Sequence, residues 1–304
     1  VDTLRRKVDR KYLGPSTAAI VNAADDREIP AIRLLDDGNL VQLGYSAAMR
    51  RIWTAETDQT SAIAETISRD KDLTKESISS VGVPVPDGRE VDSAEDAWVD
   101  EGSGVLVERS IPGIEHRLLV VGGKLVAANR SDLITVTGDG KSTVQELIDS
   151  QVNTDPRRGT TELHPLSFIR IDTAARIELE RQGLTGDGVP AAGREVLIQR
   201  NANHAFDCTD EVHPETAEQA ALAARVVGLD IAGVDLVCQD ISQPLAGQGG
   251  AIVEVNAGPS LLMHIKPGIG QPRPVGQAIV NNLFAADQSG RVPLVGVTGT
   301  HGRN

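Results

Sequence analysis

Hydrophobic and polar positions alternate most clearly in two short runs, residues 231–237 and 251–257. Both runs are rich in Val, Ile and Ala, and each is bounded by glycine and a polar loop. Runs of this length and composition predict two neighbouring β-strands. The apolar pattern is interrupted only by Asp235, Glu254 and Asn256. Glu254 and Asn256 are two residues apart and so project from one face of their strand, where Asp235 can meet them from the next strand.

The remaining pattern predicts alternating helices and strands. Helical periodicity favours helices in residues 14–24, 57–79, 142–150, 172–182, 214–228 and 275–285. Apolar runs bounded by turn residues favour strands within residues 29–44, 104–128, 194–199 and 293–298. Ser16 or Thr17 is expected to cap the first helix, although the same turn could instead hold an acidic substrate group.

Three oxygen-bearing side chains on one face are suited to a metal ion. Mg²⁺ takes hard oxygen ligands in a near-octahedral shell and is often bound together with nucleotide phosphates. The set of Asp235, Glu254 and Asn256 is equally compatible with a hairpin that carries hydrogen-bonded polar residues at its rim. On these residues alone, both interpretations stay open.

Composition narrows the class of protein. The length of 304 residues suggests about two domains or subdomains, and 40% hydrophobic with 24% charged residues is ordinary for a soluble globular protein. A net charge of −13 and an aromatic content of 2% argue against a general role in binding nucleic acid or anionic membranes. No apolar stretch approaches about 18 residues, so we expect no membrane span. Cys208 and Cys238 are too few for a disulfide framework and lack metal-ligand spacing, which favours a reducing cytoplasm.

Several ordered motifs resemble those of the ATP-grasp ligases. Asp70-Lys71 precedes the segment Gly82-Val83-Pro84-Val85-Pro86, with Lys71 eleven residues before Gly82, and residues 107–115 and the set at 235, 254 and 256 follow in order. Within that class, the chain resembles the cyanophycin synthetase family. The motifs that carry this resemblance lie at residues 14–17, 42–45, 57–61, 70–75, 155–159, 200–203 and 234–235. The resemblance spans almost the whole chain.

The resemblance implies an α/β (α+β) chain with the ATP-grasp fold. It implies an N-terminal α/β subdomain at 1–68, a central lid at 69–130 and a C-terminal platform at 131–290. Residues 291–304 resemble the start of a Mur-ligase-like module. ATP would lie between the lid and the platform.

The resemblance also assigns expected site residues. Lys71 would contact the nucleotide, the turn containing Glu108, Arg109 and Ile111 would form the adenine hinge, and Glu115 would bind the ribose hydroxyls. Mg²⁺ would be held by Asp235, Glu254 and Asn256.

The expected phosphate-binding cation needs a different source in this chain. Relatives often carry an arginine at the place of Gly233, so we expect Arg200 to be the catalytic cation, because a planar guanidinium suits the oxygens of an acyl phosphate. Ser16, Asn201 and Asn203 would bind the substrate.

The implied activity is ATP-dependent amide ligation in cyanophycin synthesis. The C-terminal carboxylate of a poly-aspartate chain would be activated as an acyl phosphate and then attacked by the amine of L-aspartate. Expected ligands are ATP, Mg²⁺, aspartate and a cyanophycin primer, and we expect a cytoplasmic homo-oligomer that binds neither nucleic acid nor membrane. Three alternatives stay open: joining of preformed β-aspartyl-arginine dipeptides, another ATP-grasp ligase such as a glutathione-synthetase-like enzyme, and a non-catalytic nucleotide-binding scaffold.

The chain departs from the family at two loops. A lysine-bearing strand and a Gly-rich phosphate loop are missing near residues 99–103, and His204-Ala205-Phe206-Asp207 stands where relatives have a Ser/Gly-rich loop. Gly-rich loops over phosphates move, so a sequence that carries only ordered residues would lack them, and we favour that interpretation. A true deletion would instead leave an inactive domain. Arg303-Asn304 also stands where a Mur-type phosphate loop has Gly-Lys-Thr.

Overall fold

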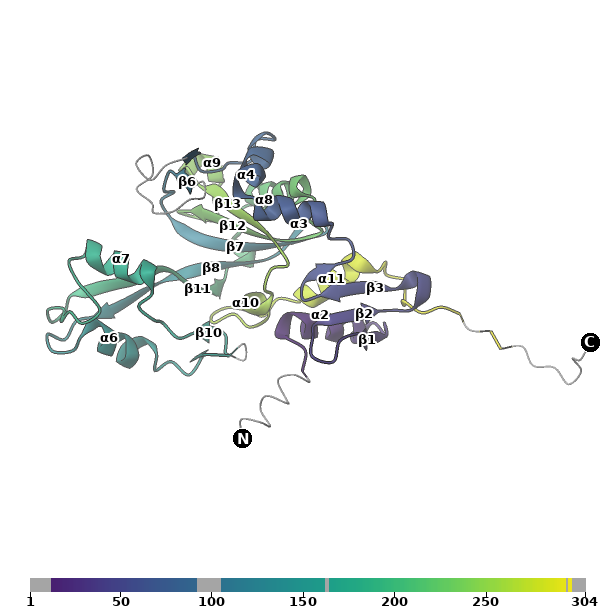
Figure 1. Cartoon of the computed structure of the whole chain (residues 1–304), viewed down its shortest axis with the longest axis horizontal. Coiled ribbons are helices and arrows are strands. Elements are labelled where there is room, and N and C mark those ends of the chain that lie inside the picture. The colour runs from purple at the N-terminus through teal and green to yellow at the C-terminus, as the bar shows by residue number, and fades with distance from the viewer. Residues whose placement is uncertain (1–11, 92–104, 162–163, 294, 297–304) are drawn as a thin grey trace, which may run out of the picture.

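The computed structural model describes residues 12–91, 105–161, 164–293 and 295–296, with the backbone alone at 89–91, 105–107, 132 and 201–205. Its centre is a five-stranded antiparallel sheet with the order β11-β8-β7-β12-β13 (Figure 1). The strands are β7 (Ile114–Val121), β8 (Lys124–Thr137), β11 (Glu195–Asp207), β12 (Ile231–Cys238) and β13 (Ala251–Ala257). The two strands predicted at 231–257 are therefore confirmed as neighbours.

Three helices cover one face of this sheet: α3 (Ala62–Arg69), α4 (Lys71–Ser79) and α8 (Pro214–Val227) (Figure 1). Their apolar side chains share one core with the sheet, including Ile78, Leu118 and Val234. The helical region predicted at 57–79 is divided at Asp70, which ends α3 and caps α4 by accepting a hydrogen bond from the Leu73 amide at 3.0 Å. This break fixes the start of α4 and hence the position of Lys71.

The opposite face of the sheet packs against an N-terminal unit. This unit holds α2 (Pro15–Asp26), α11 (Val275–Leu283) and an antiparallel sheet of β1 (Ala31–Arg33), β2 (Leu40–Leu43), β3 (Arg50–Trp53) and β4 (Glu56–Thr57). Its core includes Leu119 and Ile231 of the central sheet. Gly14, rather than Ser16 or Thr17, is the N-cap of α2, and no side chain caps that helix, so the capping prediction is wrong.

The outer parts of β8 and β11 extend into a separate lobe, residues 134–200 (Figure 1). The lobe has its own core, which includes Val136, Leu179 and Ile198. Its other elements are α6 (Val144–Leu147) with a π-helical turn at Ile148–Val152, β9 (Arg158–Gly159), β10 (Leu166–Ser167) and α7 (Thr173–Arg181). Strand β8 runs across the boundary predicted at residue 130, and the four predicted domain ranges stay a prediction.

The smaller elements are β5 (Gly88–Val91), which pairs with β6 (Val105–Glu108), and the short helices α9 (Leu245–Gln248) and α10 (Leu262–Ile265). The loop departure near 99–103 and half of the strand predicted at 293–298, residues 294, 297 and 298, lie outside the described residues. Residues 293, 295 and 296 are not in a strand.

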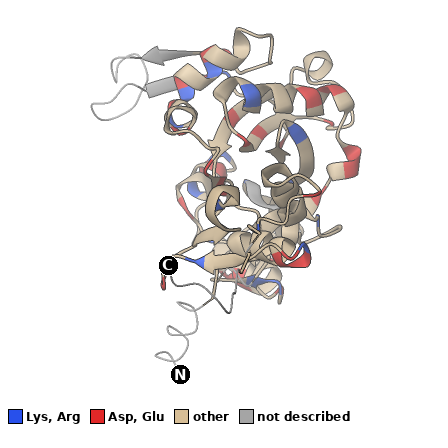
Figure 2. Ribbon diagram, turned by 90° about the vertical axis from the view of Figure 1, so that its right-hand side faces the viewer, with Lys and Arg blue, Asp and Glu red and all other residues tan. Residues whose placement is uncertain are grey.

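Among the coloured residues of Figure 2, Lys and Arg are scattered among Asp and Glu in that view. No helix of the described ranges is long and apolar enough to span a bilayer.

Candidate functional site

The three predicted metal-binding side chains converge on one face of the central sheet. Asp235 of β12 is the register partner of Glu254 of β13. Asn256 Nδ2 donates to Asp235 Oδ2 at 3.1 Å and to Glu254 Oε2 at 3.2 Å. The predicted convergence is confirmed. The set combines two carboxylates with one amide, and within the described ranges no group of three His, Cys, Asp or Glu side chains could hold a metal ion.

Arg117 is a member of this site that the sequence pattern did not reveal. It is the register partner of Asp235 on β7. Its guanidinium makes a bidentate ion pair, with Nε donating to Asp235 Oδ1 and Nη2 donating to Oδ2 at 2.7 Å. A Cβ atom at Gly233 would lie 3.3 Å from Arg117 Nη1 and 2.8 Å from the Cβ of Pro259. Any side chain at position 233 would therefore overlap Pro259 and crowd the Arg117 guanidinium.

Burial and charge act differently on the two carboxylates. Burial raises the pKa of Asp235 to about 6, against the opposing pull of Arg117, and the nearby Glu115 and Glu254 raise it further. Burial alone would also raise the pKa of Glu254, but the hydrogen bond from Asn256 and the contact with Lys71 bring it below the ordinary value. Glu254 therefore carries a firm negative charge at neutral pH.

Helix α4 brings two lysines to the site. Lys71 Nζ lies 3.2 Å from Glu254 Oε1, so the residue predicted to contact the nucleotide lies beside the predicted metal set. One turn further along, Lys75 is buried and forms an ion pair with Glu108 at the end of β6. The helix thus joins β13 to the predicted hinge.

The predicted hinge is an irregular connection between β6 and β7. It begins after Glu108, where the Arg109 amide donates to the Asp87 carbonyl at 2.7 Å. Ile111 in this connection is half-buried. Gly113 has φ of +141°, and a Cβ atom there would overlap the Cys238 carbonyl, so the connection passes directly against the end of β12.

Glu115, the residue expected to bind ribose, is half-buried at the start of β7. It stands opposite Val237 in the register of β12. Because it is two residues from Arg117, it projects from the same face of β7 as that arginine.

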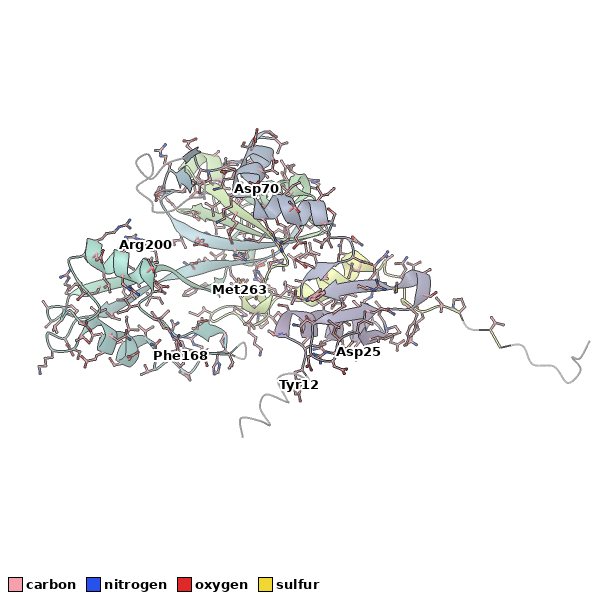
Figure 3. All side chains as sticks on the ribbon, in the orientation of Figure 1. Tyr12, Asp25, Asp70, Phe168, Arg200 and Met263 are labelled. Atoms are coloured by element: carbon pink, nitrogen blue, oxygen red, sulfur yellow. The ribbon has the colours of Figure 1, made fainter. Side chains whose placement is uncertain are left out.

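Arg200 is not brought to the Asp235 group. It lies in the lobe, beside α7 (Figure 3), and makes a bidentate ion pair with Glu178 of that helix, at 2.9 Å and 3.0 Å. Counting strand steps places it about 15–20 Å from Asp235. Asn201 and Asn203 follow it on β11, and their side chains lie outside the described residues.

Ser16 connects the N-terminal helix to the segment after β13. Its side chain is buried, and its Oγ accepts a hydrogen bond from the Leu261 amide at 3.0 Å. This contact holds the start of α2 beside the segment that follows β13, the strand of Glu254 and Asn256. The predicted role of Ser16 in binding substrate stays a prediction.

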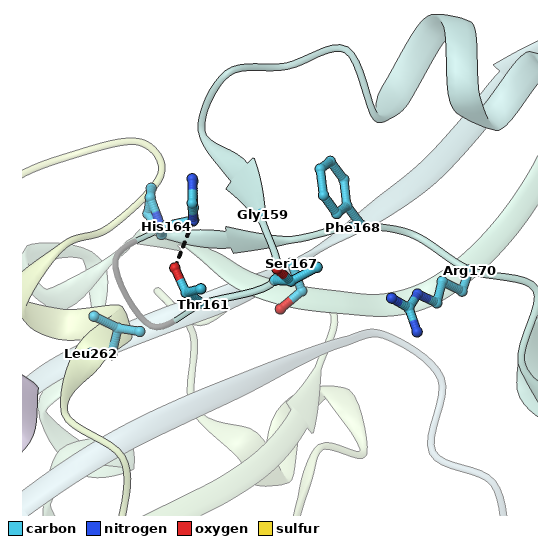
Figure 4. A pocket seen from close by; sticks show the side chains of 9 residues that line it. Gly159, Thr161, His164, Ser167, Phe168, Arg170 and Leu262 are labelled. Atoms are coloured by element: carbon cyan, nitrogen blue, oxygen red, sulfur yellow. Dashed lines mark hydrogen bonds between the residues drawn. The ribbon is translucent and has the colours of Figure 1, made fainter. Parts of the chain in front are cut away.

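A pocket of about 350 Å³ lies at the edge of the lobe, and Asp235, Glu254 and Asn256 are not among the residues that line it (Figure 4). It is lined on one side by Leu262 of α10 and on the other by lobe residues that include His164, Phe168 and Arg170. The motif at 155–159 borders it and fastens the lobe to the rest of the chain, because Arg157 Nη1 donates to the Gly268 carbonyl at 2.8 Å.

Comparison with known proteins gives a consistent result. The chain is 37% identical over 337 aligned residues to a cyanophycin synthetase of a Nostoc species, which covers 96% of this chain and 37% of that protein. It is 36% identical to a cyanophycin synthetase of a Synechocystis species, over 100% of this chain and 40% of that protein. The chain thus spans about two fifths of the length of these relatives. No family model matches.

The fold also resembles a solved structure. A bifunctional glutathione synthetase from Pasteurella multocida superposes with a TM-score of 0.67 at 24% identity, covering 90% of this chain and 44% of that one.

The Nostoc alignment extends over more positions than the 304 residues of the chain, so relatives carry residues that this sequence lacks.

Proposed function

Because the chain has the ATP-grasp fold and is a relative of the cyanophycin synthetases, we propose that it is an ATP-dependent carboxylate–amine ligase of cyanophycin synthesis. The observation that carries the proposal is the meeting of Asp235, Glu254 and Asn256 with the cations of Lys71 and Arg117. A nucleoside triphosphate bound with Mg²⁺ requires hard oxygen donors for the metal and cations for the phosphates.

The proposed reaction has two steps. A carboxylate oxygen at the end of the poly-aspartate chain attacks the γ-phosphorus of ATP, giving an acyl phosphate and ADP. The amine of L-aspartate then attacks the acyl carbon, phosphate leaves with the bonding electrons, and the amine loses a proton. Both steps place negative charge on phosphate oxygens, so catalysis depends mainly on positioning and charge neutralisation.

The residues present fit Mg²⁺. The two carboxylates of Asp235 and Glu254 are hard donors, and a half-turn of the Asn256 amide would direct its oxygen to the same place. When bound, the ion would neutralise phosphate charge. Lys71 and Arg117 would then hold phosphate oxygens, a task that suits the planar guanidinium of Arg117.

The remaining proposed contacts follow the resemblance. Glu108, Arg109 and Ile111 would hold the adenine, and Glu115 would bind the ribose. Arg200 is paired with Glu178 in the lobe, and β8 and β7 separate its strand from that of Asp235. Arg117 is already beside the carboxylates, so we assign the main phosphate contact to Arg117 and keep Arg200 as a secondary candidate.

The substrate contacts and the cellular setting are also proposals. Ser16, Asn201 and Asn203 would contact the acceptor chain. We propose a cytoplasmic homo-oligomer that does not bind nucleic acid. Two free, buried cysteines support the cytoplasmic setting, and the net charge of −13 supports the absence of nucleic-acid binding.

A second candidate is a non-catalytic nucleotide-binding scaffold. The observation in its favour is the shorter length of this chain in the alignment with its relatives, together with the loop departures at 99–103 and 204–207. A scaffold would bind Mg·ATP without releasing ADP in the presence of any acceptor.

Measurement of ADP release separates these candidates. The protein is given Mg·ATP and a short synthetic cyanophycin primer, together with L-aspartate, β-aspartyl-arginine dipeptide or the substrates of glutathione synthetase. The proposal predicts ADP release with primer and L-aspartate. Release only with the dipeptide would reassign the substrate, and Mg·ATP binding without release from any mixture would favour the scaffold.

A further inference from the structure

Lys75 is a buried lysine on α4, next to Thr74, which is also buried. Its side chain is 11% exposed, and its ammonium group makes an ion pair with Glu108, whose side chain is 28% exposed. A lysine is seldom buried unless it is paired, because an ammonium group loses its hydration there. The contact therefore holds Glu108 firmly to α4.

Glu108 is the last residue of β6, at the point where the predicted adenine hinge begins. The backbone that follows it is held at two further points, by the bond from the Arg109 amide to Asp87 and by the close passage of Gly113 against Cys238. The side chain of Glu108 fixes the entry to this connection. Its partner Lys75 therefore ties the start of this connection to α4.

Helix α4 carries Lys71 and Lys75 one turn apart, so the two side chains project from the same face, about 6 Å apart along the axis. Lys71 reaches Glu254 in the metal set, and Lys75 reaches the hinge. We propose that Lys75 is a positioning residue that sets the adenine end of the nucleotide site through Glu108. This inference rests on the proposed function, because it requires that a nucleotide binds between the hinge and the metal set.

The two lysines provide matched variants for calorimetric binding. Lys75→Met is expected to weaken binding of Mg·ATP and of adenosine about tenfold, and to leave binding of tripolyphosphate within about twofold of wild type. Lys71→Met is expected to show the reverse, with weak tripolyphosphate binding and unchanged adenosine binding. Lys75→Arg keeps the charge and should restore most of the adenosine affinity. Glu108→Gln, which removes the negative charge of the partner, should also weaken adenosine binding and leave tripolyphosphate binding within about twofold of wild type.

A structural role alone would give a different result. The inference is overturned if Lys75→Met and Glu108→Gln weaken the binding of adenosine and of tripolyphosphate equally. It is also overturned if they weaken the binding of neither ligand, because Lys75 is then only a stabilising residue. Lys75→Gln, which removes the charge but keeps a polar side chain at this position, keeps the test decisive where Lys75→Met does not fold. Failure of the wild-type protein to bind Mg·ATP would instead overturn the proposed function.

Discussion

Some polar residues of the site could be predicted from the sequence, and one could not. Asp235, Glu254 and Asn256 interrupt apolar runs at spacings that give one strand face, so their convergence could be predicted from local alternation. Arg117 could not be found in this way, because its pairing with Asp235 depends on the register between β7 and β12. The available signal was the pair Glu115 and Arg117, two residues apart at the start of an apolar strand.

The Arg117–Asp235 pair gives a stability prediction. Arg117→Met leaves the Asp235 carboxylate buried without its cation, so the free energy of unfolding should fall by about 3–5 kcal/mol. Arg181 is the control, because its ion pair with Glu178 at 3.6 Å is 68% exposed on the arginine side, and Arg181→Met should change stability by less than about 1 kcal/mol. Urea unfolding measures both. Equal stability of the two variants would show that Asp235 does not depend on Arg117.

His116 gives a prediction for acid conditions. Burial lowers the pKa of His116 from 6.5 to about 4, with Arg130 contributing and the Ile114 carbonyl opposing. The unfolded chain therefore binds more protons between pH 6.5 and 4, so the stability that His116 contributes is complete above pH 6.5 and is lost as the pH falls towards 4. The loss is about 3 kcal/mol at most.

The comparison with His116→Gln isolates this contribution. Asp235 changes the free energy of unfolding in the opposite direction as the pH falls below about 6. Its raised pKa makes the folded state bind a proton before the unfolded state does. The free energy of unfolding should therefore be followed from pH 7.5 to 4.5 in both proteins. The decline should be smaller in His116→Gln, and parallel curves would contradict the assignment.

At the scale of elements, periodicity located most helices and strands, whereas long-range partners were not predictable. Residues 275–283 form the predicted helix α11, but its place against α2 brings together segments more than 250 residues apart. The prediction of one helical region at 57–79 also missed its division at Asp70. This single aspartate is both the last cap of α3 and the first cap of α4, so no separate loop marks the break in the sequence.

The close packing of α2 on α11 can be tested at Gly276. A Cβ atom there would overlap the Ala19 carbonyl, so Gly276→Ala should destabilise the protein by about 1–3 kcal/mol. Gly247→Ala is a matched control within α9, since nothing lies within 4 Å of its added Cβ atom. Thermal unfolding should show a lower midpoint for Gly276→Ala only. A normal midpoint for that variant would mean that the two helices can separate at little cost.

At the scale of the whole molecule, the order of the motifs along the chain gave the fold class. It did not give the lobe as a separate packed body, because the lobe core forms only where the outer parts of β8 and β11 pair and pack against α6 and α7. It also placed Arg200 near the carboxylates, although the extension of β11 carries that residue into the lobe. These differences arise from strand length and register, which local patterns do not determine.

The most direct test of the central claim is mass spectrometry of a synthetic cyanophycin primer incubated with the protein, ATP, Mg²⁺ and L-aspartate. The account predicts that the primer gains the mass of one aspartyl residue, that the gain requires both ATP and Mg²⁺, and that Glu254→Ala abolishes it while leaving the fold intact. An unchanged primer with a protein that binds Mg·ATP, or full extension by Glu254→Ala, would contradict the account.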